Sequence, residues 1–424
     1  MKILYHHRIR SKDGQHVHID ELTSALKRRG HQIVMVGPRA VTEEDFGADG
    51  GMVDWLKRHL PKIVYEILEC GYNIVAARRL YRAVRQHRPD VIYERYNLFN
   101  FAGVWVKSRT GLPFLLEVNA PLADERARFG GLGLPLLARW IEARTWRGAD
   151  LVLPVTGVLA DRVHAEGVPR DRMVVIPNGI DLERFPPDLD SQAAKRRLGI
   201  EGRLVLGFTG FMRPWHGLDR VVRFIAESDP ALSLHFLLVG DGPARAEVSA
   251  LADQLGVSDR VSFAGLVARD QVAGYVAAFD IALQPDVVAY ASPLKLFEYM
   301  ALGRAIIAPG SANIREILTD GRDAVLFDPE NPDAFRAAMA RLCSDPDLRA
   351  RIGAAARTAI LDQRLTWDAN AERVEALFAK LLAAPGKAGH PRSLRPGPEG
   401  LAPRRRHGPD MAPGPRRRNR PAPG

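Results

Sequence analysis

Two patterns of hydrophobic residues alternate along the first 384 residues of this chain. Apolar runs of three to six residues, many of them β-branched, predict buried strands. Longer stretches with apolar residues three and four positions apart predict helices, such as residues 17–29, which end at Gly30. This alternation is typical of α/β folds with doubly wound parallel sheets.

The predicted strands fall into two sets. The first set is residues 3–5, 32–36, 90–93, 114–118, 151–154 and 173–176, and the second is 204–207, 234–239, 261–263, 281–284, 305–308 and 324–327. The Phe-Pro-Pro sequence at 185–187 suits a linker between them. We therefore expect two Rossmann-like domains, residues 1–185 and 186–366, and a helix, residues 367–384, that packs back toward the first domain. The carboxyl ends of both sheets would face a central cleft, where open α/β sheets bind ligands.

One βαβ unit of the second set, residues 280–308, has the features of an anion site. Ser292 suits a helix N-cap and Pro293 the first helical position, and apolar residues follow at helical spacing. The N–H groups at such a helix start attract a diphosphate, and Lys295 adds a full charge. Glu298 would lie on the same face and reach a hydroxyl beside that phosphate. A capped surface helix with a Lys–Glu pair is the alternative.

Loops after other predicted strands hold further candidate contacts. Arg213 and His216 suit phosphate oxygens, and the backbone near Val267 suits the lining of a base pocket. Glycines let the backbone approach a ligand closely, and the candidates are Gly14, Gly210 and Gly240. Each loop alone is also compatible with an ordinary turn at the end of a strand.

Polar residues of the first half form a second group of candidate site residues. His16 and His18 lie near the first predicted loop, and Glu117 and Asn119 lie at the end of the strand 114–118. A buried Glu117 would need a partner or a function. The histidine spacing matches no standard zinc pattern, so we expect no metal and a histidine that is catalytic or contacts a second substrate, with a structural role as the alternative.

Composition narrows the class of protein. The 424 residues are 46% hydrophobic and 26% charged, which predicts two or three soluble globular domains. There is no run of 18 apolar residues, and the apolar run at the N-terminus is too short for a signal peptide, so we expect neither a membrane span nor a leader. Cys70 and Cys343 are far apart and favour core thiols in a reducing cytosol over a disulfide.

The net charge of +10 is unevenly spread. Residues 385–424 hold 10 Lys and Arg against 2 Asp and Glu, with many Pro and Gly, which predicts a disordered basic tail. We expect a solvated extension without a nucleic-acid partner; contact with nucleic acid or anionic lipid is the alternative. Residues 1–185 hold 28 Lys and Arg against 22 Asp and Glu, and residues 55–88 and 132–140 mix basic with apolar positions. This suits an anionic membrane surface, or else helices that face a core.

These motifs resemble those of the retaining glycosyltransferases of family 4, which have the GT-B fold. The resemblance covers residues 1–384. Its most specific part is SPLKLFEYMA at 292–301, supported by PNGID at 177–181 and GDGP at 240–243.

The resemblance implies a UDP- or GDP-linked sugar donor held by the second domain without a metal, and a glycan or lipid-linked acceptor held by the first. Glu298 would hold the ribose hydroxyls, and the backbone from Ser292 to Lys295 the diphosphate. The implied donor contacts are Gly14, Gly210, Gly240, Val267, Tyr290, Ser292, Pro293, Leu294 and Glu298. The implied catalytic residues are Arg213, His216, Lys295 and Glu298, and His16, His18, Glu117 and Asn119 lie on the acceptor side.

This chain departs from the family pattern at three places. Tyr290 stands where the family usually has a glutamate near the donor sugar. Both usual cations of the phosphate motif are missing between residues 210 and 217, and we expect Arg213, His216 and Lys295 to restore positive charge together. Asn119 replaces a usual histidine.

The expected function is sugar transfer with retention, in surface or exopolysaccharide biosynthesis. The protein would stabilise the leaving diphosphate electrostatically and aim the acceptor hydroxyl. The missing cations favour one alternative, a catalytically degenerate subunit that only binds nucleotide sugars. A GT-B nucleotide-sugar epimerase is another, which Tyr290 fits poorly.

Overall fold

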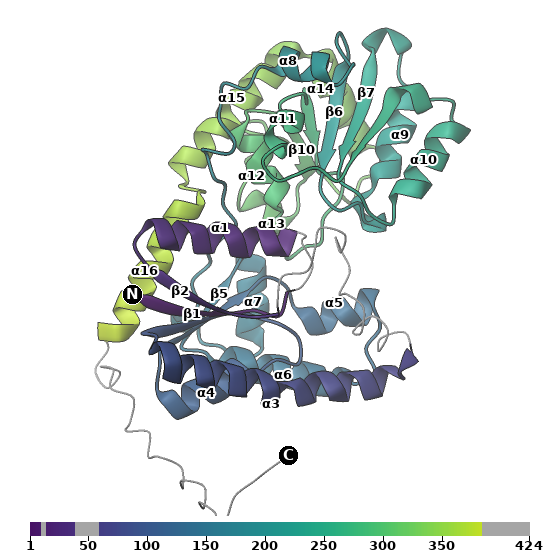
Figure 1. Cartoon of the computed structure of the whole chain (residues 1–424). Coiled ribbons are helices and arrows are strands. Elements are labelled where there is room, and N and C mark those ends of the chain that lie inside the picture. Colours follow the sequence, from purple (N-terminus) through teal and green to yellow (C-terminus); the bar gives the residue numbers. More distant parts are fainter. Residues whose placement is uncertain (10–13, 39–58, 384–424) are drawn as a thin grey trace, which may run out of the picture. The chain divides into compact units, whose positions relative to one another are not determined.

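The computed structural model describes residues 1–9, 14–38 and 59–383. In these residues the strands form two separate sheets, in which every pairing is parallel (Figure 1). The first has the order β2-β1-β3-β4-β5, from β1 (Lys2–His6), β2 (Gln32–Val36), β3 (Val91–Arg95), β4 (Phe114–Val118) and β5 (Leu151–Pro154). The second has the order β11-β10-β9-β6-β7-β8, from β6 (Leu204–Thr209), β7 (Leu234–Val239), β8 (Val261–Gly265), β9 (Ile281–Leu283), β10 (Ala305–Pro309) and β11 (Val325–Phe327).

The predicted strand at residues 173–176 is wrong. The N–H groups of Val174 and Ile176 donate to the carbonyls of Val152 and Pro154 in β5, at 3.1 and 3.0 Å. The segment therefore runs along the edge of β5, but only one bridge, at Met173, joins it to the sheet. Pro177 follows without an N–H group, so the pairing cannot continue.

Helices cover both faces of the first sheet. The helices of this half are α1 (Gly14–Arg28), α3 (Lys62–His87), α4 (Ala102–Thr110), α5 (Leu122–Phe129), α6 (Pro135–Gly148) and α7 (Gly157–Ala165). Apolar residues of α3, α4, α6 and α7 share one buried cluster with the sheet. On the other face, Ile19, Leu22 and Leu26 of α1 pack against Tyr5 and Tyr93. The helical spacing of these three residues explains why α1 lies on the sheet.

The second sheet is also covered on both faces. Its helices are α8 (Ser191–Arg197), α9 (Leu218–Glu227), α10 (Arg245–Gln254), α11 (Val272–Val276), α12 (Leu294–Ala301), α13 (Ala312–Arg315), α14 (Ala334–Ser344) and α15 (Pro346–Asp362). One buried cluster includes α12 and α15, and the other includes α9, α10 and α14. The short 3-10 helix η3 (Pro214–His216) follows β6.

The helix α16 (Trp367–Ala383) completes the core of the first half. Its Trp367 and Phe378 are buried in the cluster that holds Tyr93. Arg28 of α1 is 2.9 Å from Asp368. The predicted tail, residues 385–424, lies outside the described residues, as do residues 55–58 of the basic stretch. Cys70 and Cys343 are both free thiols. Within the described ranges, every helix is too short or too polar to span a membrane.

Candidate active site

The start of α12 differs from the prediction by one residue. The helix begins at Leu294, and Pro293 occupies the N-cap position that we predicted for Ser292. The Ser292 hydroxyl instead accepts from the backbone N–H of Asn178 at 3.2 Å, and the Asn178 side chain donates to the Ser292 carbonyl at 2.5 Å. These two hydrogen bonds from Asn178, a residue of the first half, hold the turn that leads into α12. The first N–H groups of the helix have no intrahelical acceptor and suit an anion.

Lys295 of the first turn lies over an aromatic ring of β6. Its Nζ is 3.6 Å from the centroid of Phe208. Burial lowers the pKa of Lys295 to about 7, against the opposing effect of Glu298. A Cβ atom at Gly210 would lie 3.4 Å from the Lys295 Cε atom, so the glycine loop and the lysine are neighbours. An approaching phosphate would stabilise the ammonium form of this lysine.

His216 lies on the same aromatic ring, but it does not supply the positive charge that we expected. Its ring centroid is 5.1 Å from that of Phe208. Burial and the charges of Lys295 and Arg213 hold the pKa of His216 well below its usual range. Its Nδ1 accepts from the backbone N–H of Arg213 at 3.2 Å. The neutral ring therefore carries its proton on Nε2 and contributes a hydrogen-bond donor.

The guanidinium of Arg213 lies close to two aromatic faces. Its guanidinium carbon is 4.8 Å from the ring centroid of Phe211 and 5.0 Å from that of Trp215. Trp215 in turn stacks on Phe129 of α5, with ring centroids 4.5 Å apart. The loop after β6 in the second half is thus in contact with the first half.

Glu298 is a buried carboxylate with two partners. Arg269 donates to its Oε1 atom from Nη1, and the hydroxyl of Thr209 donates to Oε2 at 3.3 Å. Neither partner of Glu298 is among the residues predicted from the sequence. Arg269 follows Val267 by two residues in the loop after β8, and a cation at the carboxyl end of a strand was a usable signal.

Two glycine loops meet beside Lys295. Gly210 and Gly240 both have positive φ, at 116° and 126°, and a Cβ atom at Gly240 would overlap the Gly210 carbonyl. Only glycine fits such an approach. Val267 is partly buried against the core cluster that contains Phe297. Across from these loops, Gly14 lies near the first turn of α12, because its Cβ atom would be 3.4 Å from Leu294 Cδ1.

Glu117 at the end of β4 is the centre of a second polar cluster. It is only 2% exposed. It accepts from Tyr93 at 2.7 Å, from Arg95 and Asn119 at 2.5 Å each, and lies 2.9 Å from Nε2 of His18. Burial raises the pKa of Glu117, but His18, Arg95 and Asn119 outweigh it and lower that pKa overall. The carboxylate is therefore ionised and fully occupied by neighbours.

His18 joins this cluster to α12. Its Nδ1 is 2.7 Å from the Oδ1 atom of Asn178. The Asn178 amide nitrogen donates to Ser292, so its oxygen must accept, and both nitrogens of His18 face acceptors. A chain of hydrogen bonds runs from Glu117 through His18 and Asn178 to Ser292. His16 lies apart from it, with Nε2 3.1 Å from Asp20 on the same helix.

Tyr290 contacts residues of the first half. Its hydroxyl donates to Glu125 of α5 at 2.5 Å, and its carbonyl accepts from Thr156 at 3.1 Å. Burial and the neighbouring Glu125 raise the pKa of Tyr290. A protonated phenol bound to a carboxylate is a positioning group.

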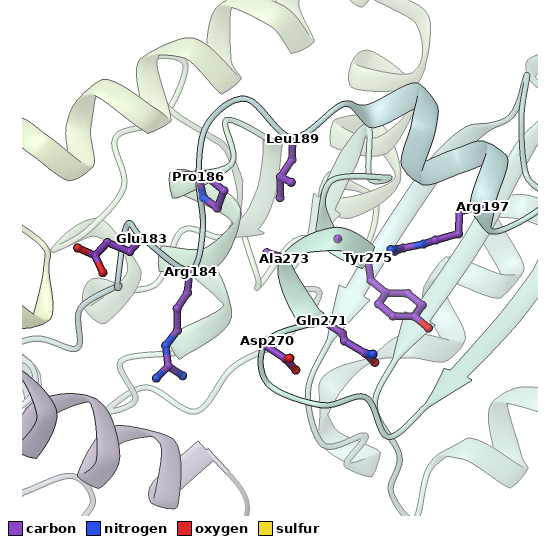
Figure 2. A pocket seen from close by; sticks show the side chains of 10 residues that line it. Glu183, Arg184, Pro186, Leu189, Arg197, Asp270, Gln271, Ala273 and Tyr275 are labelled. Atoms are coloured by element: carbon purple, nitrogen blue, oxygen red, sulfur yellow. The ribbon is translucent and has the colours of Figure 1, made fainter.

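A cavity of about 560 Å³ lies beside the loop that carries Arg269 (Figure 2). The residues that line it include Arg184, Pro186 of the linker, Asp270 and Gln271 just before α11, and Tyr275 in α11. None of these is a predicted site residue, but Asp270 directly follows Arg269. In the described part of the chain, no three His, Cys, Asp or Glu side chains are grouped to hold a metal ion.

Each half of the chain matches a family of known proteins. Residues 12–184 match Glycosyltransferase Family 4, and residues 203–345 match Glycosyl transferases group 1. The D-inositol 3-phosphate glycosyltransferase of Thermomonospora curvata is 28% identical over 389 residues, covering 85% of this chain and 89% of that protein. The GDP-mannose-dependent alpha-mannosyltransferase of Mycobacterium tuberculosis is 26% identical over 356 residues, covering 79% and 85%.

Solved structures share the fold. The structure of Anabaena HepE in complex with UDP has a TM-score of 0.70 and 18% identity, and the match covers 90% of this chain and all of that one. At this identity the likeness concerns the fold, and it confirms the predicted pair of parallel-sheet α/β domains.

Proposed function

Because this chain belongs to the GT-B glycosyltransferases of the family 4 and group 1 type, we propose that it is a retaining hexosyltransferase. Its donor is a UDP- or GDP-linked sugar, and its acceptor is a glycan or a lipid-linked glycan. Its place is in surface or exopolysaccharide biosynthesis, in the cytoplasm. The donor class rests on the relatives, among which HepE binds UDP and the mycobacterial enzyme depends on GDP-mannose.

The observation that carries this proposal is the group of residues around Phe208. Lys295 and His216 both contact its ring, and Gly210 lies beside Lys295. A diphosphate at the start of α12 would meet helix N–H groups, one ammonium and one neutral imidazole donor. Arg213 adds a permanent charge close by. This set offsets the charge that develops on a leaving nucleoside diphosphate.

Glu298 suits the ribose of that nucleotide. Its carboxylate lies one helical turn beyond Lys295, with Thr209 on one oxygen. Two vicinal hydroxyls would donate to it, and charge-assisted hydrogen bonds of this kind are strong. Val267 in the neighbouring loop would then lie beside the base.

The proposed reaction needs no carboxylate nucleophile. The bond between the anomeric carbon and the diphosphate oxygen breaks, and a bond to the acceptor oxygen forms on the same face. The acceptor proton passes to the leaving phosphate oxygen, so atoms and charges balance. Tyr290 holds Glu125 and does not touch the reacting atoms in this scheme. No metal takes part in the proposal, since side chains supply the charge.

We also propose that the first half rests on the cytosolic face of an anionic membrane, where a lipid-linked acceptor would be found. Large apolar side chains are exposed on α3 and α6, among them Ile67 at 55%, Leu136 at 82% and Trp140 at 59%. Lys62 begins α3, and Arg78 and Arg79 lie further along it. Glu66 of α3 accepts from the backbone N–H groups of Gly133 and Leu134, which precede α6, so the starts of these two helices are neighbours. Basic and apolar residues together suit binding to an interface.

The test of the transferase is nucleotide release from UDP-, GDP- and ADP-sugars, with membrane lipid extracts as acceptors. Release from one donor that requires an acceptor, and is lost in Glu298→Ala and Lys295→Ala, would support the proposal. Binding without release, across all donors and extracts, would instead favour a degenerate nucleotide-sugar-binding subunit. Anomer-resolved NMR of the product distinguishes retention from inversion.

The membrane contact is tested by sedimentation with vesicles. We expect binding to vesicles with phosphatidylglycerol, weaker binding to pure phosphatidylcholine, and loss in Leu136→Ser with Trp140→Ser. Leu361→Ser is the matched control, because Leu361 is also 59% exposed but lies on α15 of the other half. Equal losses in both variants would contradict a specific surface.

A further inference from the structure

The proposed ribose site already has an internal partner. Arg269 donates to the same Glu298 carboxylate that the ribose hydroxyls would use. Thr209 donates to the other oxygen, so each oxygen of the carboxylate already has a partner. Because Glu298 is only 5% exposed, a ribose hydroxyl that approaches Oε1 would compete with Arg269 for that oxygen. The displaced guanidinium would then need another partner.

Glu21 of α1 is the candidate. It is buried, at 2% exposed, and both of its carboxylate oxygens have no hydrogen-bond partner among the described residues. Its Oε1 is 3.8 Å from Nη2 of Arg269 and 3.5 Å from Nη1 of Arg184. Burial raises the pKa of Glu21, against the opposing charges of Arg184 and Arg269. A buried carboxylate without hydrogen bonds is costly, which leaves it able to gain from an approaching cation.

We propose that Arg269 is a positioning residue with two alternative partners, Glu298 before the donor binds and Glu21 once ribose hydroxyls occupy Glu298. This rests on the proposed function, because it takes Glu298 as the ribose site. The two ends of one guanidinium already face the two carboxylates, Nη1 toward Glu298 and Nη2 toward Glu21. A shift of about 1 Å would bring Nη2 to hydrogen-bond distance of Glu21.

The surroundings of Arg269 suit such a shift. Its guanidinium carbon lies 5.1 Å from the ring centroid of Phe185, and an aromatic face holds a cation without fixing its hydrogen bonds. Its Nε atom is buried and has no hydrogen-bond partner in the part of the chain that the structure describes. Arg184, which is close to Glu21, and Asp270, which follows Arg269, both line the cavity of Figure 2. The cavity thus borders the residue that follows Arg269 and a second arginine beside Glu21.

The consequence is a link between the donor and the acceptor side. Glu21 lies three residues after His18 on α1, so both project from one side of the helix. His18 is bonded to Glu117 and to Asn178, which holds Ser292. An Arg269–Glu21 contact would tie the loop after β8 to α1 when the donor is bound. Donor binding would in this way stabilise the helix that carries part of the acceptor side.

The test is a double-mutant cycle on nucleotide binding with Arg269→Gln, Glu21→Gln and the pair. Calorimetry would measure the Kd of UDP and GDP, and then of their 2′,3′-dideoxy analogues, in the full chain. With the ribonucleotide that binds, we expect Glu21→Gln to weaken binding about fivefold in the wild-type background and to have no effect beside Arg269→Gln. With the dideoxy analogue, Glu21→Gln should have no effect in either background.

Three results would overturn the inference: no effect of Glu21→Gln, an equal effect in both backgrounds, or a coupling that persists with the dideoxy nucleotide. The matched control is the exposed pair Arg336 and Glu227, changed to Gln in the same way, which should leave every Kd unchanged. Melting temperatures without nucleotide show whether a variant folds. If no nucleoside diphosphate binds to the wild type, the proposed function fails as well. If binding depends on Glu298 but shows no coupling, only this inference fails.

Discussion

Two buried glutamates, Glu117 in the first half and Glu298 in the second, show how similar residues take different roles. Each is at most 5% exposed and each contacts an arginine. Glu117 has four partners, all from its own half, and one of them is the buried Arg95. Glu298 has two, and its arginine is 24% exposed and faces a second carboxylate. Burial alone therefore does not separate the two glutamates; the exposure and the second contact of the arginine partner do.

The largest effect should come from the donor side. Lys295→Ala should lower kcat/KM by about 10²- to 10³-fold, because one preorganised charge at the leaving group is lost. The free energy of unfolding should change little, because the variant also removes an ammonium group that burial disfavours. Transfer assays and thermal melts measure the two quantities. Lys380→Ala on exposed α16 surface is the control. A melting temperature that falls together with activity would show that Lys295 is mainly structural.

At the polar cluster around Glu117 we expect a large effect on stability. Glu117→Gln leaves the buried Arg95 without its countercharge and should cost about 3 kcal/mol of unfolding free energy. Glu298→Gln should cost clearly less, because Arg269 can turn toward Glu21 or solvent. Urea unfolding of the two variants, with unchanged m-values, measures the difference. Equal losses would remove the distinction between the two glutamates.

Much of the fold was readable from the sequence, because buried parallel strands are local apolar runs. The match is close for β4 and β7, where the predicted and observed bounds agree. It fails at 173–176, where a strand depends on the edge of β5 rather than on local pattern. The N-cap prediction at Ser292 fails for a similar reason. Asn178, 114 residues away, uses that hydroxyl, and no local rule reports such a contact.

The candidate site was readable in part. Glycine and Ser-Pro motifs located the loops that the structure brings together around Phe208. The charge of His216 was not readable, because it depends on burial and on two neighbouring cations. Arg269 was missed because its partners, Glu298 and Glu21, are distant in the sequence. Local patterns place functional groups, whereas their protonation and pairing follow from tertiary contacts.

Nucleotide-sugar binding should depend on pH through Lys295. Its pKa is about 7 in this structure, and a bound diphosphate would raise it. Affinity should therefore be full below pH 7 and fall by up to about tenfold per pH unit above it, because binding then requires proton uptake. Calorimetry with UDP-glucose and GDP-mannose measures this, since their diphosphates do not titrate in that range. Lys295→Met should bind weakly with a flat profile. The same slope in that variant would assign the effect to another group.

The smallest effect is expected at the contact between the halves. Tyr290→Phe removes the hydrogen bond to Glu125 and should lower kcat/KM by no more than about fivefold, the size of one net hydrogen bond. The aromatic ring, which packs on the core of the first half, is retained. Tyr72→Phe, which loses a hydrogen bond with Arg79 at an exposed position, is the matched control. Steady-state kinetics on both variants decide the matter. A loss of a hundredfold or more in Tyr290→Phe alone would mean that this phenol touches the reacting sugar. The group of residues that contacts the donor would then include residues of both halves. The comparison of Glu117 in the first half with Glu298 in the second would no longer separate the roles of the two halves.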